Sequence, residues 1–228
     1  MTLDNVSTTS SLLLISKNRM LPSAKAIRQL DTNKLITGIR FLFYSMMGKN
    51  IVAHQNVKIV GMKNIDTRGR LYIGTSYTGF SHPNDRTFLN VRGSLIVQSN
   101  FIIGRGCRID IGPNAICELG SGYINANTQL VIKHGLKIGQ GVAIAWNCEF
   151  LDDDFHSLYY EGKKEKQQRI EIGDHVWIGS GVKILKGVRI ANNNVIASNS
   201  LVTKSFVEEN VLIAGNPARI VKTNIKWE

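Results

Sequence analysis

Aliphatic residues recur at every sixth position in the C-terminal half of the chain. The series runs without a slip through Ile172, Ile178, Ile184, Ile190, Ile196 and Val202. A second series follows four positions behind it, at Val176, Val182, Val188, Asn194, Ser200 and Phe206. A β-strand has a period of 2 and an α-helix one of 3.6, so neither explains this pattern. The pattern indicates a structure assembled from six-residue units.

A prism-shaped solenoid has this period, because each unit then forms one short strand and one corner. The aliphatic residue points into the prism, and three units close one turn. Residues one turn apart then stack at about 4.8 Å, the usual spacing of strands. The same spacing occurs earlier in the chain, at Ile103, Ile109, Ile132, Ile138, Ile144 and Phe150. We therefore predict an all-β parallel solenoid over residues 51–207.

The repeat is interrupted in two places. It is blurred between residues 111 and 131, and it stops between 151 and 170, where the segment is polar and contains three consecutive aspartates. The units restart at Glu171. An excursion from a rigid scaffold is where functional residues usually lie, so the 151–170 loop is the first candidate for a site.

Residues 22–47 precede the solenoid and have helical spacing. We expect one helix over 24–30 and a second that opens at Asp31 and Thr32 and ends at Gly48. The second has a single apolar stripe, made of Leu35, Ile36, Ile39, Leu42, Phe43, Met46 and Met47. We expect the stripe to cap one end of the core. A membrane-surface helix is the alternative, disfavoured because Lys34 and Arg40 are its only basic residues. The predicted organisation is an N-terminal segment (1–50), the solenoid with its loop (51–207) and a tail (208–228).

The composition is that of a globular protein, with 43% hydrophobic residues among 228. A formal net charge of +11 favours anionic partners without choosing among them. Three widely spaced cysteines suggest neither a disulfide framework nor a zinc site, and Cys107 and Cys148 fall on small inward positions of the repeat. With neither a signal peptide nor an apolar run of about 20 residues expected, we predict a cytoplasmic protein.

His156 lies behind the aspartates of the 151–170 loop. It is a candidate general base, with a neighbouring carboxylate to orient it and balance its charge. The alternative is a surface histidine in an acidic loop. The remaining histidines, at positions 54, 82, 134 and 175, do not pair at the spacing of a metal site, so no metal is expected.

Outward positions of the repeat carry a second set of candidates. Trp177 ends its unit and should point outward, where a tryptophan needs a partner: a second subunit, the capping helix or a ligand. Another outward column consists of Asp174, Ser180, Lys186, Asn192, Ser198 and Lys204. The stacking of successive turns puts Ser180 beside Ser198 and Lys186 beside Lys204. Together along one edge, these groups could hold an extended, phosphorylated cofactor; a merely solvated edge is the alternative.

Three segments carry a resemblance to a known family: residues 170–190 with Trp-Ile-Gly, 200–204 with Val-Thr-Lys, and 214–219 with Gly-Asn-Pro-Ala-Arg. With these motifs the sequence resembles the hexapeptide-repeat acyltransferases, in particular their maltose/galactoside and capsular-polysaccharide O-acetyltransferase branches. The resemblance is strong over 100–228, looser over 50–100 and absent from 1–50.

The resemblance implies a left-handed parallel β-helix, a homotrimer and active sites between subunits. It implies an acetyl-CoA-dependent O-acetyltransferase that acts on a sugar or polysaccharide without a metal. His156 matches the catalytic histidine, with Asp154 beside it. The matching acceptor-side positions are Asn125, Trp146 and Asp153. The matching positions for acetyl-CoA are Trp177, Ser180, Ser198, Thr203, Lys204 and Lys222.

Two positions depart from the family. Asp153 stands where many polysaccharide-modifying relatives have a second histidine. Lys133 stands where the galactoside enzyme has an acceptor-side aspartate, which favours a different acceptor, one that is acidic. For the oxyanion, backbone N–H groups at the corners near Gly179–Gly181 are candidates.

Three other functions remain open. The first is N-acetylation of an amino sugar or an amino-containing antibiotic. The second is a zinc enzyme like the γ-class carbonic anhydrases, although the histidine spacing does not supply its ligands. The third is a non-enzymatic scaffold that binds polyanions.

Overall fold

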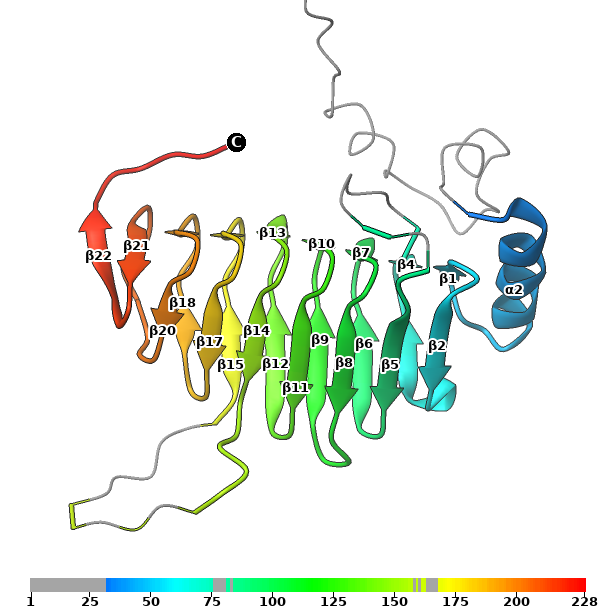
Figure 1. Cartoon of the computed structure of the whole chain (residues 1–228), viewed down its shortest axis with the longest axis horizontal. Helices are drawn as coiled ribbons and strands as arrows, with labels where there is room; N and C mark the ends of the chain where they lie inside the picture. The colour runs from blue at the N-terminus through cyan, green and yellow to red at the C-terminus, as the bar shows by residue number, and fades with distance from the viewer. Residues whose placement is uncertain (1–31, 76–80, 83, 158, 160, 163–167) are drawn as a thin grey trace, which may run out of the picture.

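Three parallel β-sheets form a long prism in the computed structural model, which describes residues 32–75, 81–82, 84–157, 159, 161–162 and 168–228 (Figure 1). Sheet A consists of β1 (Ile51–Ala53), β4 (Leu71–Ile73), β7 (Phe101–Ile103), β10 (Gly122–Ile124), β13 (Val142–Ile144), β16 (Trp177–Ile178), β19 (Val195–Ile196), β21 (Leu212–Gly215) and β22 (Ala218–Lys222). Sheet B consists of β2 (Val57–Val60), β5 (Thr87–Val91), β8 (Arg108–Ile111), β11 (Gln129–Ile132), β14 (Glu149–Leu151), β17 (Lys183–Leu185) and β20 (Leu201–Val202). Sheet C consists of β3 (Ile65–Thr67), β6 (Ser94–Val97), β9 (Ile116–Leu119), β12 (Gly135–Ile138), β15 (Ile170–Ile172) and β18 (Arg189–Ile190).

The chain visits sheets A, B and C in turn, and each strand from β1 to β17, as well as β19, pairs in parallel with the strand one turn later. This order confirms the predicted all-β left-handed parallel β-helix. The prism has three edges, which we name the A/B, B/C and C/A edges after the sheets that the chain joins there. β22 departs from the pattern, because it folds back antiparallel on β21 at the C-terminal end.

The length of a turn changes along the prism. Ile172 pairs with Ile190 and Ile178 with Ile196, so these turns consist of three six-residue units, as predicted. Ile124, by contrast, pairs with Ile144, so that turn is longer than three units. Extra corner residues between β8 and β9 explain why the repeat is blurred between 111 and 131. Longer excursions leave the prism between β4 and β5 and between β14 and β15.

The interior is a stack of mainly aliphatic side chains, with one or more from each strand. Ile178, Ile184 and Ile196 are fully buried, as the period of six predicts. Each such side chain stabilises the fold by about 1.5–3 kcal/mol. Burial raises the pKa of the Cys107 thiol to about 12 and that of the Cys148 thiol to about 11. Both side chains are buried, so these cysteines belong to the core, as predicted, and their thiolates are disfavoured at neutral pH.

Asparagine and glycine make the corners of the A/B edge possible. The left-handed backbone conformation recurs there once per turn, at Gly106, Asn127, Asn147, Gly181 and Asn199. These residue types tolerate a positive φ. A Cβ at Gly181 would lie 2.3 Å from Asn199 Oδ1, so this corner also needs glycine for space.

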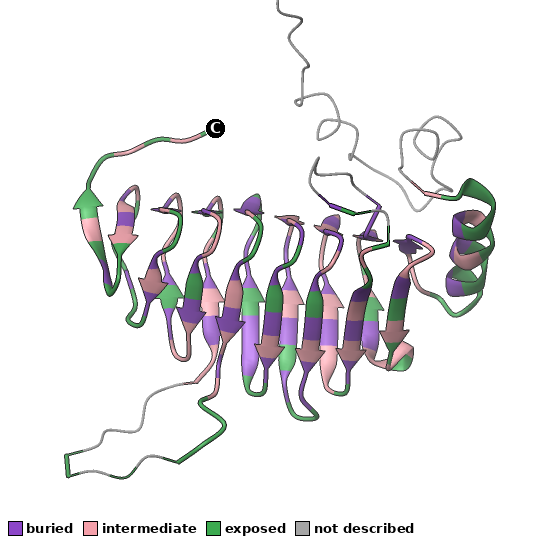
Figure 2. Ribbon diagram, in the orientation of Figure 1, coloured by how far each residue is buried: buried purple, intermediate pink, exposed green. Residues whose placement is uncertain are grey.

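α2 (Lys34–Met46) packs beside β1 at the N-terminal end (Figure 1). Its N-cap is Asn33, whose side chain accepts from the Ile36 amide, so the helix begins later than predicted. The earlier predicted helix, 24–30, lies outside the described residues. The predicted orientation is wrong. The side chains of Thr37, Phe41 and Tyr44 are buried, whereas the whole apolar stripe is exposed (Figure 2).

Arg40 explains this orientation. Its guanidinium donates to the backbone carbonyls of His54, Gln55 and Val57 at 2.8–3.1 Å and to the Tyr44 hydroxyl at 2.7 Å. These bonds turn the Arg40 side of the helix toward β1 and β2, so the aliphatic stripe points away. Within the described residues, no helix has the length and apolar character needed to cross a bilayer.

Candidate active site

The 151–170 loop leaves the prism at the B/C edge, between β14 and β15 (Figure 1). Its base is fixed by Asp152, which is completely buried. The Asp152 carboxylate accepts backbone N–H groups of three successive residues of the preceding turn, Lys133, His134 and Gly135, at 2.7–2.8 Å. Charge-assisted bonds of this kind are among the stronger hydrogen bonds in proteins. Sequence analysis assigned roles to Asp153 and Asp154 but none to Asp152.

The next two aspartates bind neighbouring turns of the prism. Asp153 accepts from His134 Nε2 at 2.6 Å and from Lys133 Nζ at 3.3 Å. The His134 imidazole is the main reason that the pKa of Asp153 lies below its ordinary value. Asp154 binds Lys186 Nζ at 2.5 Å, on the following turn. The start of the loop is therefore held by the turns on both sides of it. Because Lys133 already pairs with the Asp153 carboxylate, its positive charge is weaker evidence for an acidic acceptor.

His156 is exposed beyond these anchors. Its Nδ1 lies 3.4 Å from the backbone carbonyl oxygen of Asp154. Asp153 and Asp154 do not serve as the predicted carboxylate neighbour, because their carboxylates bind His134 and Lys186 instead. The backbone carbonyl favours the tautomer with its proton on Nδ1, which leaves Nε2 as the basic nitrogen.

Trp146, Ser180 and Ser198 line up on the A/B edge, one per turn, and Asn125 lies on the same edge one position nearer to its sheet A strand. Ser180 Oγ donates to Ser198 Oγ at 3.2 Å, as the stacking of turns predicts. Lys186 lies on the B/C edge instead, because each six-residue unit advances the chain by one edge. The prediction that serines and lysines share one edge is therefore wrong.

His156, the candidate base, thus lies on a different edge of one subunit from the acceptor candidates Asn125 and Trp146, whereas the acceptor candidate Asp153 lies in the same loop as His156. Sheet B separates the two edges, and its strands beside the site are two to four residues long. A strand of three or four residues spans roughly 10–13 Å. One subunit does not bring Trp146 and Ser180 next to the start of the 151–170 loop.

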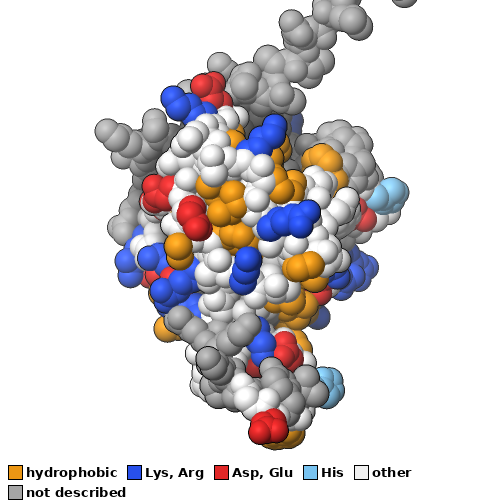
Figure 3. Space-filling view, turned by 90° about the vertical axis from the view of Figure 1, so that its left-hand side faces the viewer, with side chains coloured by type: hydrophobic (Ala, Val, Ile, Leu, Met, Phe, Trp, Pro, Cys, Tyr) orange, Lys and Arg blue, Asp and Glu red, His pale blue; other side chains and the backbone are white. Residues whose placement is uncertain are grey.

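A pocket of about 590 Å³ opens at the C-terminal end of the prism, lined by Thr203, Lys204, Arg219 and the β21–β22 turn. Figure 3 shows this end, where hydrophobic side chains lie at the centre with Lys and Arg side chains beside them. Thr203 and Lys204 were predicted as contacts of acetyl-CoA. Lys222, predicted with them, does not line the pocket. Arg219 does, and the only signal for it was its place at the end of the Gly-Asn-Pro-Ala-Arg motif.

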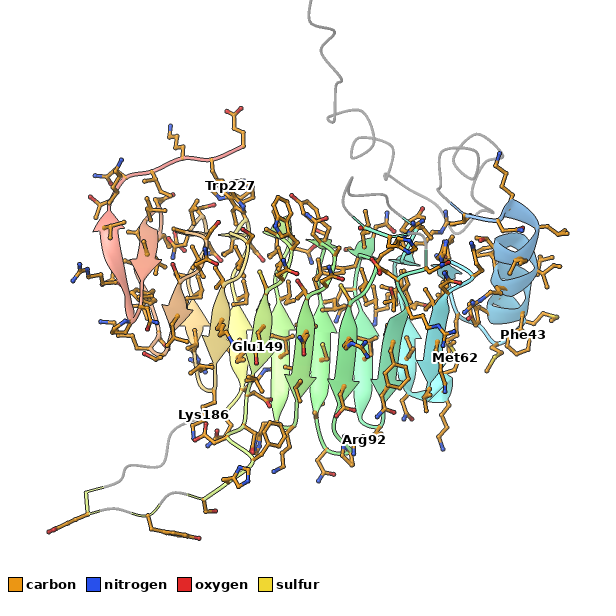
Figure 4. All side chains as sticks on the ribbon, viewed as in Figure 1. Phe43, Met62, Arg92, Glu149, Lys186 and Trp227 are labelled. Atoms are coloured by element: carbon orange, nitrogen blue, oxygen red, sulfur yellow. The ribbon has the colours of Figure 1, made fainter. Side chains whose placement is uncertain are left out.

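Trp177 finds its partner in the C-terminal tail. It points outward from sheet A and packs against Trp227, with ring centroids 6.1 Å apart. Trp227 also stacks on His175 at 4.1 Å and donates through Nε1 to the His175 carbonyl at 3.0 Å. Figure 4 shows Trp227 and Lys186 on opposite sides of the prism. Sequence analysis missed Trp227, because the tail has no repeat to place it.

Two backbone N–H groups predicted to stabilise the oxyanion already donate to carbonyl groups of the prism. The Gly179 amide donates to the Ile196 carbonyl at 2.8 Å, and the Gly181 amide to the Trp146 carbonyl at 3.0 Å. Both bonds belong to the stacking of adjacent turns, so neither amide is available to a substrate. In the described part of the chain, no three His, Cys, Asp or Glu side chains converge as metal ligands would.

Comparison with known proteins shows the class of protein to which this chain belongs. The sequence profile described as bacterial transferase hexapeptide (six repeats) matches residues 169–204. The chain belongs to the hexapeptide-repeat acyltransferase family. It is 42% identical over 198 residues to an uncharacterized 24.8 kDa protein in the cps region of Klebsiella pneumoniae. The alignment covers 85% of this chain and 89% of that relative.

Solved structures with a similar course of the chain include two acyltransferases. The polysialic acid O-acetyltransferase OatWY is 28% identical, with a TM-score of 0.46 over 78% of this chain and 90% of that chain. A variant of AntD, an N-acyltransferase from Bacillus cereus, in complex with dTDP-4-amino-4,6-dideoxyglucose and coenzyme A, is 19% identical. Its TM-score is 0.49 over 81% of this chain and 89% of that chain.

Proposed function

We propose that this protein is an O-acetyltransferase that moves the acetyl group of acetyl-CoA to a hydroxyl group of a sugar or polysaccharide, with His156 as the general base. The observation that carries the proposal is the anchored start of the 151–170 loop. Asp152, Asp153 and Asp154 each bind the prism, and His156 follows them at the surface. Such anchoring suits a side chain that must hold a fixed position while it exchanges a proton with substrates.

The proposed reaction is a direct transfer. Nε2 of His156 removes the proton from the acceptor hydroxyl as its oxygen attacks the thioester carbonyl carbon. The carbon–sulfur bond then breaks, and the CoA thiolate takes the proton from the imidazolium. The carbonyl oxygen of Asp154 stabilises the protonated ring through Nδ1. Asp154 therefore contributes through its backbone, and its carboxylate holds the loop on Lys186.

Acetyl-CoA would approach the C-terminal end of the prism. Lys204 and Arg219 at the pocket bring two positive charges for its phosphates, and Thr203 adds a hydroxyl. The serine pair, Ser180 and Ser198, offers hydroxyl groups to the amides of the pantetheine arm. An arginine guanidinium suits phosphate recognition because it is always charged and can donate two parallel hydrogen bonds to phosphate oxygens.

A homotrimer is part of the proposal, because one subunit leaves the site divided. The loop histidine at the B/C edge of one subunit would meet Asn125, Trp146 and Trp177 of a neighbouring subunit. The outward face of sheet A supports such an assembly: Tyr72, Ile102 and Tyr123 are only partly buried there. Apolar side chains on a flat outer face are typical of a surface that another protein covers.

The proposal that the acceptor is a polysaccharide is supported by a sequence relative and not by the geometry of the site. The cps region named for the Klebsiella relative fits an enzyme that modifies a polysaccharide, and Asp153 would contact the acceptor beside the loop. Since acetyl-CoA is a cytoplasmic metabolite, the proposal implies a cytoplasmic reaction.

The test is acetyl-CoA-dependent release of free thiol, measured with a panel of neutral and acidic oligosaccharides and amino sugars. We expect an oligosaccharide to stimulate release and His156→Ala to lower turnover by about 10²-fold or more. CoA affinity and the unfolding midpoint should stay unchanged in that variant. Ser157→Ala, at the next exposed position, is the matched control and should keep full activity.

Two results would decide against the proposal. Stimulation by amino sugars alone would assign the protein to N-acetylation. Full activity of His156→Ala with any acceptor would exclude His156 as the base, whatever the acceptor.

A further inference from the structure

The outer face of α2 is an extended apolar surface that lies outside the candidate site. Every member of its stripe is a large side chain left between 41% and 81% exposed: Leu35, Ile36, Ile39, Leu42, Phe43, Met46 and Met47. Their spacing of three and four residues places them on one side of the helix. A contiguous exposed patch of this kind marks a surface that meets a protein or a membrane.

The charge around α2 indicates which of the two. Between residues 32 and 75 the chain has seven Lys and Arg residues and one acidic residue, Asp66. More than half of the formal net charge of +11 therefore comes from this N-terminal end. Lys34, Lys58 and Lys63 are exposed there, whereas Arg40 is committed to the carbonyls that hold the helix.

We propose that the outer face of α2 docks on the surface of an anionic phospholipid bilayer. The apolar side chains would enter the boundary between headgroups and acyl chains, and the lysines would meet the lipid phosphates. A second copy of the chain fits this end less well, because two copies would bring two strongly positive surfaces together.

The position of α2 is compatible with activity on a bilayer. α2 lies at the N-terminal end of the prism, and β22 lies at the other end (Figure 1). The C-terminal pocket, lined by Thr203, Lys204 and Arg219, therefore faces away from the proposed membrane contact. Docking would hold the enzyme at the bilayer and leave the pocket accessible.

The test is flotation of the full chain with vesicles of phosphatidylcholine alone and of an equimolar mixture with phosphatidylglycerol. We expect binding to the mixed vesicles and little to phosphatidylcholine, with a loss of binding at high salt. The triple variant Leu35→Gln, Leu42→Gln, Met46→Gln should lower the partition coefficient by about 100-fold. Lys58→Gln and Lys63→Gln should lower it about fivefold each.

The matched control is Val207→Gln, which removes a side chain that is 76% exposed toward the C-terminal end. It should bind like the wild type, and all variants should keep their unfolding midpoints and thiol-release activity, because the replaced side chains are exposed in the fold. Binding that survives the triple variant, or that Val207→Gln abolishes equally, overturns the proposal. The proposal is also overturned if the wild type does not bind anionic vesicles and light scattering shows a larger assembly that the triple variant does not form. That result would assign the face to a second copy of the chain.

Discussion

Asp152→Asn is the sharpest test of how the 151–170 loop is held. The substitution keeps the size of the side chain and replaces one carboxylate oxygen by an amide NH2 group. In the wild type, Oδ1 accepts from Lys133 N, and Oδ2 accepts from both His134 N and Gly135 N. Asparagine has one oxygen, so it can keep two of these three bonds at best.

The magnitude follows from what is lost. A hydrogen bond to a charged group contributes about 1.5–3 kcal/mol, and a buried donor without an acceptor costs about 1–3 kcal/mol. Because Asp152 is completely buried, water cannot replace the lost oxygen. We expect the free energy of unfolding to fall by about 3 kcal/mol. For a protein of this size, that lowers Tm by roughly 6–12 °C.

The assay is urea unfolding followed by circular dichroism, at equal protein concentrations. Asp153→Asn is the matched control, because its partners Lys133 and His134 are partly exposed and exposed ion pairs contribute about 1 kcal/mol or less. An Asp152→Asn variant no less stable than Asp153→Asn would refute the assignment of three backbone bonds to Asp152.

Three further predictions concern other parts of the molecule. The pKa of Asp153 is lowered in the fold, chiefly by the imidazole that it binds, so its ionised form adds stability above the unfolded pKa of about 3.9. That stability is lost as the pH falls through the lower folded pKa, and the difference in urea midpoint between wild type and Asp153→Asn should shrink below about pH 4. Arg219→Gln should raise the KM for acetyl-CoA about tenfold, whereas Lys222→Gln, outside the pocket, should leave it nearly unchanged; the reverse order would restore the sequence-based assignment. Trp227→Ala should expose Trp177 and shift the tryptophan fluorescence to longer wavelength, with a loss of about 1 kcal/mol of stability; an unchanged spectrum would mean that the two rings do not pack in solution.

The residues of the candidate site show which features the sequence could predict and which it could not. The sequence indicated the 151–170 loop and His156, because an interruption in a strict repeat is visible without coordinates. It gave roles to Asp153 and Asp154 and none to Asp152, since side chains of one type at successive positions carry no sign of their partners. Those partners lie on the preceding and following turns, far along the chain, and only the stacking of turns brings them together.

What the sequence determined by itself is the β-helix, because the rule behind it is local. One inward aliphatic side chain and one tight corner in each six-residue unit suffice, and Ile178, Ile184 and Asn199 follow that rule wherever their turn lies in the stack. Tertiary structure decided everything that depends on a particular neighbour. Arg40 turned the apolar stripe of α2 outward by binding carbonyls of the β1–β2 turn, and the returning tail put Trp227 on Trp177. Periodicity records which side of an element is apolar, whereas the choice of what that side faces is made by contacts between segments far apart in the chain.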